Sequence, residues 1–248
     1  MAAVALLTLG MASCERDDDT TDNPTDPTNP TYPSGGGTDP GTDTTTVSVT
    51  AGEWIDLGLP SGLLWRSCNL GAESPEEYGD YYAWGETSTK DEYTNTTYIH
   101  FADSIQILLT KYCNKPNLAF NGQADYLTTL EPIDDPSTAV LGLEVHTPTR
   151  AQFMELLANT HSEWVRLNGV YGRKYTAGNG NSLFIPAGGC KRGDTISFTE
   201  TIGCYWTSSL VTTDPLTAWA LDLRMDHDTV GRSWRYFGYT IRAVRMQD

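Results

Sequence analysis

The sequence predicts an α+β domain that follows a disordered N-terminal tether. Residues 20–46 consist mainly of Thr, Asp, Pro, Gly and Ser, with Tyr32 as the only aromatic residue. After Val47, two segments carry apolar residues at helical spacing, and most segments that read as strands come after them. Because strands and helices in separate blocks are typical of α+β domains, we expect two main helices packed on short antiparallel sheets.

The first 13 residues read as a lipoprotein signal peptide. A short apolar run starts at Ala3 and stops at Cys14, directly after the small residues Ala12 and Ser13. This order resembles the lipobox of bacterial lipoproteins, in which the cysteine becomes the lipidated N-terminus. The acidic residues 15–19 resemble the signal that directs Bacteroidota lipoproteins to the outer face of the outer membrane. The sequence therefore predicts a lipid-anchored, surface-exposed protein; a buried strand or a cloning remnant is the alternative interpretation of the apolar run.

Residues 14–46 are expected to form the acidic tether. Such a composition cannot bury enough apolar surface to offset the entropy lost on ordering. At ~3.1 Å per residue, an extended, Pro-rich segment of this length reaches roughly 100 Å. Its net charge of −7 leaves −9 on residues 47–248, which hold all 7 Trp and 12 of the 13 Tyr. We therefore expect a single folded head over residues 47–248.

Two segments of the head predict helices. In residues 103–112, Asp103 or Ser104 is placed to cap a helix whose apolar side chains lie at i, i+3, i+4 and i+7. These side chains are Ile105, Leu108, Leu109 and Tyr112. In residues 147–157, Thr149 and Gln152 match a capping box, in which the two ends satisfy each other's backbone N–H groups. Its apolar stripe consists of Phe153, Leu156 and Leu157.

The later part of the head predicts strands. Residues 182–186 read as a short buried strand that ends at a proline. Residues 219–225 alternate, with Trp219, Leu221, Leu223 and Met225 on one face, which predicts a half-buried antiparallel strand. Residues 237–244 read as a closing strand, with residues 226–231 as the turn region before it.

Six segments of the head carry a resemblance to a known family. They are residues 65–72, 78–87, 147–149, 180–189, 205–209 and 238–244. Their order is similar to that in the Fibrobacter succinogenes major paralogous domain, and the block Tyr-Tyr-Ala-Trp-Gly-Glu-Thr at 81–87 is distinctive. The resemblance spans roughly residues 53–246. Residues 143–149 and 240–244 depart from the usual motifs of that family.

This resemblance implies a C-type-lectin-like fold, related to the formylglycine-generating-enzyme branch. The same branch includes variable receptors that bacterial retroelements diversify. The family has no well-established common activity, so the resemblance implies a fold more than a function.

Composition and motifs exclude several classes of protein. The net charge of −16 argues against nucleic-acid binding and against a grip on anionic lipid, so the membrane is expected as a partner only through the lipid anchor. No stretch reaches the ~18 apolar residues of a membrane span. The nucleophile-elbow, zinc-protease, P-loop and dinucleotide motifs are absent, and the four histidines are scattered. We therefore predict a protein without catalytic residues, metal or cofactor.

Four cysteines follow Cys14, and the sequence alone leaves three ways to pair them. An exported compartment permits disulfides. We expect Cys68 to pair with Cys113, because both lie in motifs of the resembled family, and Cys190 with Cys204, which would close a hairpin-like segment. The alternative is that Cys190 and Cys204 form a redox or copper pair, as in the formylglycine-generating enzymes.

The segment 226–236 is the candidate binding site. It combines aromatic rings, which stack on sugar C–H faces, with acids, His and Arg, which hydrogen-bond hydroxyl groups or a peptide. The candidate ligand-binding residues are Asp222, Arg224, Asp226, His227, Asp228, Arg232, Trp234 and Tyr236. For Trp234 and Tyr236 the alternative is an inward, core position. Asp222, Asp226 and Asp228 could also bind Ca²⁺, but the triplet motifs of calcium-dependent lectins are absent.

These observations predict a non-catalytic surface lipoprotein that binds a glycan or a protein ligand, in adhesion or nutrient capture. One alternative is a diversified receptor whose ligand contacts vary around residues 205–237. A second is an enzyme of the formylglycine-generating type, and a third is a structural role in a pilus tip or surface coat.

Overall fold

The computed structural model describes residues 52–102 and 108–247. The chain divides into two units, Met1–Thr45 and Thr46–Asp248, and all the described residues belong to the second. The predicted signal peptide, Cys14 and the tether lie outside the described residues.

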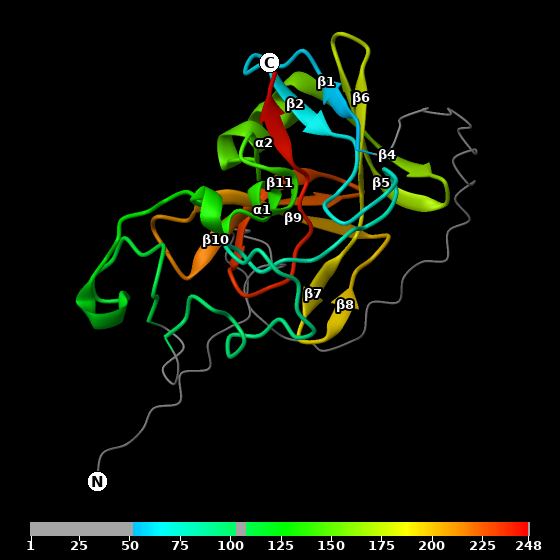
Figure 1. Ribbon diagram of the computed structural model, residues 1–248. Coiled ribbons are helices and arrows are strands. Elements are labelled where there is room, and N and C mark those ends of the chain that lie inside the picture. Colours follow the sequence, from blue (N-terminus) through cyan, green and yellow to red (C-terminus); the bar gives the residue numbers. More distant parts are fainter. Residues whose placement is uncertain (1–51, 103–107, 248) are drawn as a thin grey trace, which may run out of the picture. The chain divides into compact units, whose positions relative to one another are not determined.

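The described residues form mainly short strands (Figure 1). The strands are β1 (Trp54–Asp56), β2 (Leu63–Arg66), β3 (Val145–His146), β4 (Thr160–Leu167), β5 (Val170–Ala177), β6 (Ser182–Pro186), β7 (Cys190–Arg192), β8 (Thr195–Ser197), β9 (Ile202–Leu210), β10 (Thr217–Arg224), β11 (Asp228–Trp234) and β12 (Val244–Met246). The helices are α1 (Pro136–Leu141) and α2 (Arg150–Asn159), with single 3₁₀ turns at Phe120–Gly122 and Pro132–Asp134. Among the described residues, no helix is long and apolar enough to cross a bilayer.

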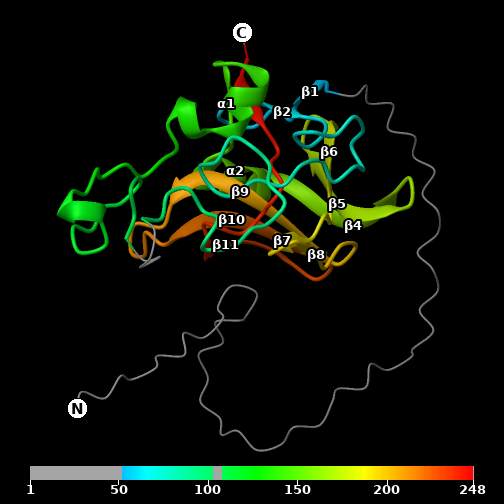
Figure 2. The ribbon, with the colours of Figure 1, turned by 60° about the horizontal axis from the view of Figure 1, so that its bottom comes forward.

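The strands pair into four small antiparallel sheets. Their orders are β1-β2-β12-β3, β11-β10-β9, β4-β5-β6 and β7-β8. Strand β12 lies between β2 and β3, so the C-terminal strand closes a sheet begun at the start of the head. Figure 2 shows β9, β10 and β11 in succession, with α2 beside the same sheet.

The predicted fold class is wrong. The sequence predicted α+β, with a C-type-lectin-like fold of two main helices packed on short sheets, whereas strands dominate the described residues. Of the two helices there, α2 has ten residues and α1 only six. The short helix α1 was not predicted; Asp135 caps it by accepting a hydrogen bond from the Ser137 N–H, and Pro136 starts it.

The predicted helix at 103–112 accounts for most of this error. Residues 103–107 lie outside the described residues, and the described part is not helical. Leu109 bridges to Phe101 and Ala119 in a strand-like manner, and Tyr112 has a left-handed φ of 59°. Leu109 and Tyr112 are buried in two different clusters. Their helical spacing therefore reflects separate tertiary contacts, not one helical face.

Helix α2 confirms the prediction for residues 147–157. Thr149 Oγ1 accepts a hydrogen bond from the Gln152 N–H, and Gln152 Oε1 accepts one from the Thr149 N–H. These two bonds satisfy donors that a helix start leaves free. Phe153 and Leu156 are fully buried, so the predicted stripe faces the core.

Strands β6 and β10 confirm two predicted strands, although β10 is more buried than expected. Leu221 and Leu223 are fully buried on one face, and Ala218 and Ala220 are buried on the other. The two sets belong to different core clusters, so the sheet has a core on each side. Met225 lies beyond the strand and is 69% exposed.

Two predictions near the C-terminus are wrong. Most of the expected turn region, 226–231, belongs to β11, which pairs with β10 from Leu223↔Asp228 to Thr217↔Trp234. The charged residues and Gly231 obscure the apolar alternation that would predict this strand, although its apolar Val230 faces the core. The expected strand 237–244 makes only isolated bridges before β12 begins at Val244.

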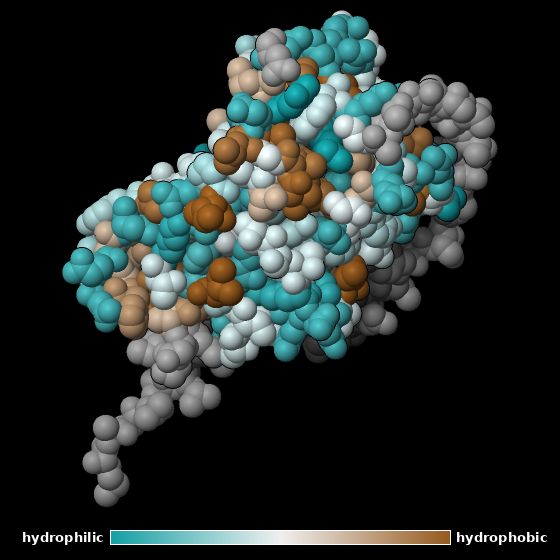
Figure 3. Space-filling model, in the orientation of Figure 1, coloured by the Kyte–Doolittle hydropathy of each residue, from teal (hydrophilic) through white to brown (hydrophobic). Residues whose placement is uncertain are grey.

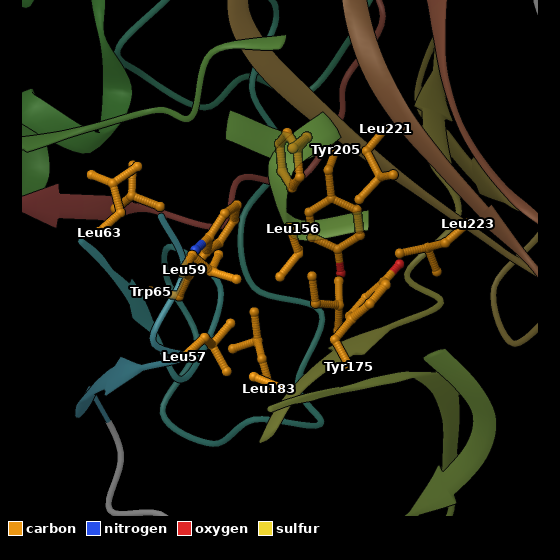
Figure 4. Packing of buried hydrophobic residues seen from close by; sticks show 14 of the residues in the cluster. Leu57, Leu59, Leu63, Trp65, Leu156, Tyr175, Leu183, Tyr205, Leu221 and Leu223 are labelled. Carbon is orange, nitrogen blue, oxygen red and sulfur yellow. The ribbon is translucent and has the colours of Figure 1, made fainter. Parts of the chain in front are cut away.

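The larger core cluster lies between α2, β10 and the sheets that flank them. Figure 4 shows Trp65, Leu156, Tyr175, Tyr205 and Leu221 converging from different elements. Burying each such side chain contributes roughly 1.5–3 kcal/mol. Through Leu221 and Val230, this cluster fixes β10 and β11 against the rest of the head.

Candidate functional site

The predicted site residues lie at opposite ends of β11. Asp228 begins this seven-residue strand and Trp234 ends it. At ~3.3 Å per residue, the two ends are roughly 20 Å apart. The structure therefore divides the predicted site into a turn end, with Asp222, Arg224, Asp226, His227 and Asp228, and a second group with Arg232, Trp234 and Tyr236.

At the turn end, each predicted acidic residue has a basic neighbour. Asp222 pairs with Arg224, with 2.8 Å between Oδ2 and Nη2. Asp226 Oδ1 lies 2.9 Å from His227 Nδ1, and both side chains are exposed. The His227 ring lowers the pKa of the Asp226 carboxyl. Both carboxylates are therefore already engaged by neighbouring side chains of the same turn.

Asp228 forms a buried ion pair with Arg173 of β5. The distance between Asp228 Oδ1 and Arg173 Nε is 2.9 Å, and the two side chains are 7% and 8% exposed. Arg173 also donates to the Met225 carbonyl, across the β10–β11 turn. Burial, with the Asp228 carboxylate nearby, raises the pKa of Tyr175 well above its ordinary value. These contacts give Asp228 a structural role.

The three aspartates of the considered calcium site do not converge. In the antiparallel register, Leu223 pairs with Asp228, so Asp228 faces the same side of the sheet as Leu223 and Asp222 faces the opposite side. Among the described residues, no group of three His, Cys, Asp or Glu side chains is arranged to hold a metal ion.

The opposite end of β11 contributes to an exposed cluster of aromatic and basic side chains. We call it the Arg–Trp surface, and it consists of Arg150, Trp219, Arg232, Trp234 and Tyr236. The Arg150 guanidinium lies over the Trp219 ring, with 3.9 Å between Cζ and the ring centroid. Trp219 is opposite Arg232 in the strand register, so both project from the same face of the sheet. The rings of Trp234 and Tyr236 stack with centroids 6.0 Å apart.

This surface is positioned by strands β9, β10 and β11 and by helix α2. The register of β10 and β11 places Trp219 beside Arg232 and Thr217 beside Trp234. The capping box of α2 fixes the first turn, which starts at Arg150, and the Arg150 N–H donates to Ser209 Oγ of β9. The inner side of Trp219 packs against the larger core cluster.

A buried arginine anchors the chain just past Trp234. Arg235 is fully buried and stacks on Trp84, with 4.7 Å between Cζ and the ring centroid. Its Nε donates to Tyr98 Oη, and its Nη atoms donate to the carbonyls of Lys111, Tyr112 and Pro215. This network holds the residues on either side of Arg235 in place.

Arg150 and Arg232 differ from the cations at the turn end. Both are exposed. Within residues 52–102 and 108–247, neither guanidinium has an ion-pair or hydrogen-bond partner. Trp219, Trp234 and Tyr236 are half-buried. For Trp234 and Tyr236, this burial lies between the exposed position of a binding residue and the inward position of a core residue. The arrangement can therefore offer two guanidinium forks and partly open ring faces to one ligand.

Sequence analysis missed Arg150 and Trp219. Trp219 was assigned to the apolar face of a strand, which is correct for its inner side. Arg150 directly follows the cap residue Thr149, and a side chain in this first position of a helix is usually exposed. That exposed position is the sequence feature that could have indicated a ligand contact at Arg150. Their meeting depends on how α2 packs on the sheet, which no local pattern predicts.

Exposed hydrophobic residues are dispersed over the head. The face in Figure 3 shows brown, hydrophobic groups separated by hydrophilic ones. The large exposed hydrophobic residues range along the chain from Ile99 to Met246.

The four cysteines of the head are buried, and the structure has each of them as a thiol. Cys68 Sγ donates to the Ala72 carbonyl, and Cys113 Sγ donates to the Lys115 carbonyl. Their expected disulfide stays a prediction. Cys190 and Cys204 lie in one core cluster, and their thiols hydrogen-bond each other.

Comparison of the chain with protein-family models, with curated proteins and with solved structures found no match. The resemblance to the Fibrobacter succinogenes domain family stays a prediction based on the motifs alone.

Proposed function

We propose that this chain is a non-catalytic, lipid-anchored surface protein whose head binds a glycan that carries carboxylate groups, at the Arg–Trp surface. The observation that carries the proposal is the pair of exposed arginines next to the half-buried Trp219: Arg150, which lies over its ring, and Arg232, its cross-strand neighbour. Neither has an acidic partner within the described residues.

The chemistry of these side chains suits an acidic sugar. A guanidinium presents parallel N–H donors that match the two oxygens of a carboxylate. The rings of Trp234 and Tyr236 present apolar faces, on which the C–H face of a sugar ring can stack, while Trp219 holds the Arg150 guanidinium over its own ring. Because the chain has a net charge of −16, long-range attraction does not favour an anion, and binding has to come from these local contacts.

The absence of catalysis in this proposal rests on the neighbours of the histidines. Within the described residues, His100 bonds the Gly85 carbonyl and His146 bonds Gln152. His161 and His227 lie beside the carboxylates of Glu163 and Asp226. In the part of the chain that the structure describes, none of the four hydrogen-bonds a Ser, Thr or Cys side chain that it could activate as a nucleophile.

The surface location rests on the N-terminal sequence. The apolar run before Cys14, the acidic residues after it and the Pro-rich tether suit a head held away from an outer membrane. In a diversified receptor, the alternative function, the variable positions would have to be exposed ones such as Arg232, because Tyr205 and Trp206 are fully buried.

An array of glycans and peptides tests the proposal directly. The head, residues 46–248, is probed against uronic-acid oligosaccharides, their methyl-esterified neutral forms, and peptides rich in Asp and Glu. We expect binding to the uronic-acid forms alone, and loss of that binding with Arg232→Gln but not with Asp226→Asn. Binding only to acidic peptides would replace the glycan with a protein ligand, and equal binding to the neutral forms would contradict the role of the arginines.

A further inference from the structure

Cys190 and Cys204 lie side by side where strands β7 and β9 begin to separate. The residues just before them, Gly189 and Gly203, form a parallel bridge, with the Gly189 N–H donating to the Ile202 carbonyl at 2.7 Å. Neighbouring strands are ~4.8 Å apart, which falls within the Cα separation of ~4.4–6.8 Å that a disulfide needs. The two side chains are 0% and 2% exposed, and their thiols are hydrogen-bonded to each other.

Two glycines let the cysteine-bearing strands pack closely on their other neighbours. A Cβ atom on Gly189 would lie 2.1 Å from the Ser197 carbonyl oxygen of β8, and the residue has a φ of +69°. A Cβ atom on Gly203 would lie 2.4 Å from Leu223 Cδ1 of β10. Only glycine fits at these positions without displacing its neighbours, so packing on β8 and β10 holds the backbone just before each cysteine.

A third segment holds both cysteine-bearing strands from the same side. Gly238 exchanges two backbone hydrogen bonds with Lys191, the residue after Cys190. Thr240 donates to the Cys204 carbonyl through both its N–H and its Oγ1. The positions of the two cysteines are therefore fixed independently of any bond between the sulfurs.

The surroundings of this pair differ from those of the other two cysteines. The Cys204 thiol, and then Arg192, lower the pKa of Cys190 to about 7 against the effect of burial. Burial raises the pKa of Cys113, whose thiol donates to a backbone carbonyl. Cys68 likewise has a carbonyl acceptor, that of Ala72. The thiolate needed for disulfide exchange is therefore favoured at Cys190.

We infer that Cys190 and Cys204 form a disulfide when the chain folds in an oxidising compartment, whereas Cys68 and Cys113 remain thiols, contrary to the pairing predicted for them from the sequence. The bond links the β7–β8 hairpin covalently to β9, which pairs with β10 in the β11-β10-β9 sheet. This inference is independent of the proposed ligand.

The reaction is a thiol–disulfide exchange with an external disulfide, such as oxidised glutathione. The Cys190 thiolate attacks one sulfur of the external disulfide and releases one thiolate. The Cys204 thiolate then attacks Cys190 Sγ and releases the second. The two protein thiols lose two electrons and two protons, and the external disulfide takes up both to become two thiols. Because the cysteines are buried in the folded head, the exchange takes place during folding.

Peptide mapping of the full chain tests the inference. The protein is refolded with oxidised and reduced glutathione, alkylated while unfolded, and digested with trypsin without reduction. Cleavage after Lys191 and Arg192 separates the two cysteines, so the disulfide joins peptides 175–191 and 193–224. We expect this single cross-link, with Cys68 and Cys113 alkylated. A link between Cys68 and Cys113, a link from Cys190 or Cys204 to any other cysteine, or full alkylation of all five would overturn it.

Thermal unfolding with and without reductant gives a second readout. Closing a loop of this size is expected to raise Tm by roughly 5–10 °C in the oxidised protein. Reductant should lower Tm in the unmodified chain and in a Cys68→Ser/Cys113→Ser variant, but not in Cys190→Ser. If reductant lowers Tm equally in Cys190→Ser, the bond lies elsewhere and the inference fails.

Discussion

The two ends of β11 use charged residues in opposite ways. At the turn end, Asp222 and Asp228 each have an arginine within 3 Å, and Asp226 has the His227 ring at the same distance. At the other end, Arg150 and Arg232 are exposed around Trp219 with no acidic partner within the described residues.

This difference separates structural charges from charges that are free to bind. A buried charge has to be neutralised inside the fold, since its desolvation costs several kcal/mol. An exposed guanidinium has no such requirement, and water satisfies it until a ligand replaces that water. Substitution of the buried Asp228 should therefore change stability, and substitutions at the Arg–Trp surface should change binding.

The largest expected effect is on stability, at the buried ion pair. Asp228→Asn leaves the Arg173 guanidinium buried without its counter-charge, and we expect a loss of about 3–5 kcal/mol in the free energy of unfolding. Urea unfolding measures it, with the exposed Asp226→Asn as control, expected to be as stable as the unmodified head. Similar small losses for both variants would break the distinction between buried and exposed charges.

The next effect depends on pH, because each end has a histidine close by. His227 is exposed at the turn end, whereas His100 is 6% exposed and lies near the buried Arg235. Burial, and then Arg235, lower the pKa of His100 from 6.5 to about 4. Below pH 6.5 the unfolded chain takes up a proton that the folded head does not, so stability falls as the pH drops from 6.5 to 4.

Urea unfolding at pH 7.5 and pH 4.5 measures this dependence. We expect His100 to account for a loss of about 2–3 kcal/mol between these pH values, which disappears in His100→Gln. His227→Gln should retain the loss. A pH dependence that is unchanged in His100→Gln would show that carboxyl groups alone govern acid unfolding.

The third effect is on binding. Replacing both arginines, as Arg150→Gln/Arg232→Gln, should weaken binding of a uronic-acid oligosaccharide at least tenfold, or about 1.4 kcal/mol. The unfolding free energy should fall by at most about 1 kcal/mol, the value of the lost contact between Arg150 and the Trp219 ring. Isothermal titration calorimetry and urea unfolding measure the two quantities. A variant that keeps its affinity would remove the arginines from the site.

The smallest effect is expected at the partly exposed pair of Asp222 and Arg224. Their side chains are 22% and 29% exposed, and such pairs contribute about 0.2–1 kcal/mol. Asp222→Asn should therefore lower stability only slightly and leave the affinity for the oligosaccharide unchanged. A clear loss of affinity would extend the binding site to the turn end.

Local interactions decided which parts of the fold could be predicted. The capping box of α2 lies within four residues, so the sequence alone indicates it. Tyr112 and Leu109 have the same apolar spacing as a helix, but contacts distant in the chain hold them, and the helix prediction was wrong. Strand β11 was missed because only Val230 carries a clear apolar signal at this sheet edge.

The candidate site, too, could be predicted from the sequence only where its residues are close together in the chain. Arg232, Trp234 and Tyr236 could be selected because they are close in sequence and chemically suited to a ligand. That Asp226 and Trp234 lie at different ends follows only from reading the segment as an extended strand. Trp219 and Arg150 join the surface through strand register and helix packing, which arise from the whole head.

The most direct test of the account compares binding at the two ends in one titration. A uronic-acid hexasaccharide is titrated into the unmodified head, into Arg150→Gln/Arg232→Gln, and into Asp222→Asn/Asp226→Asn. We predict at least a tenfold rise in Kd for the arginine variant and an unchanged Kd for the aspartate variant. Equal Kd values for all three proteins, or a weakening confined to the aspartate variant, would contradict the assignment of the Arg–Trp surface as the binding site.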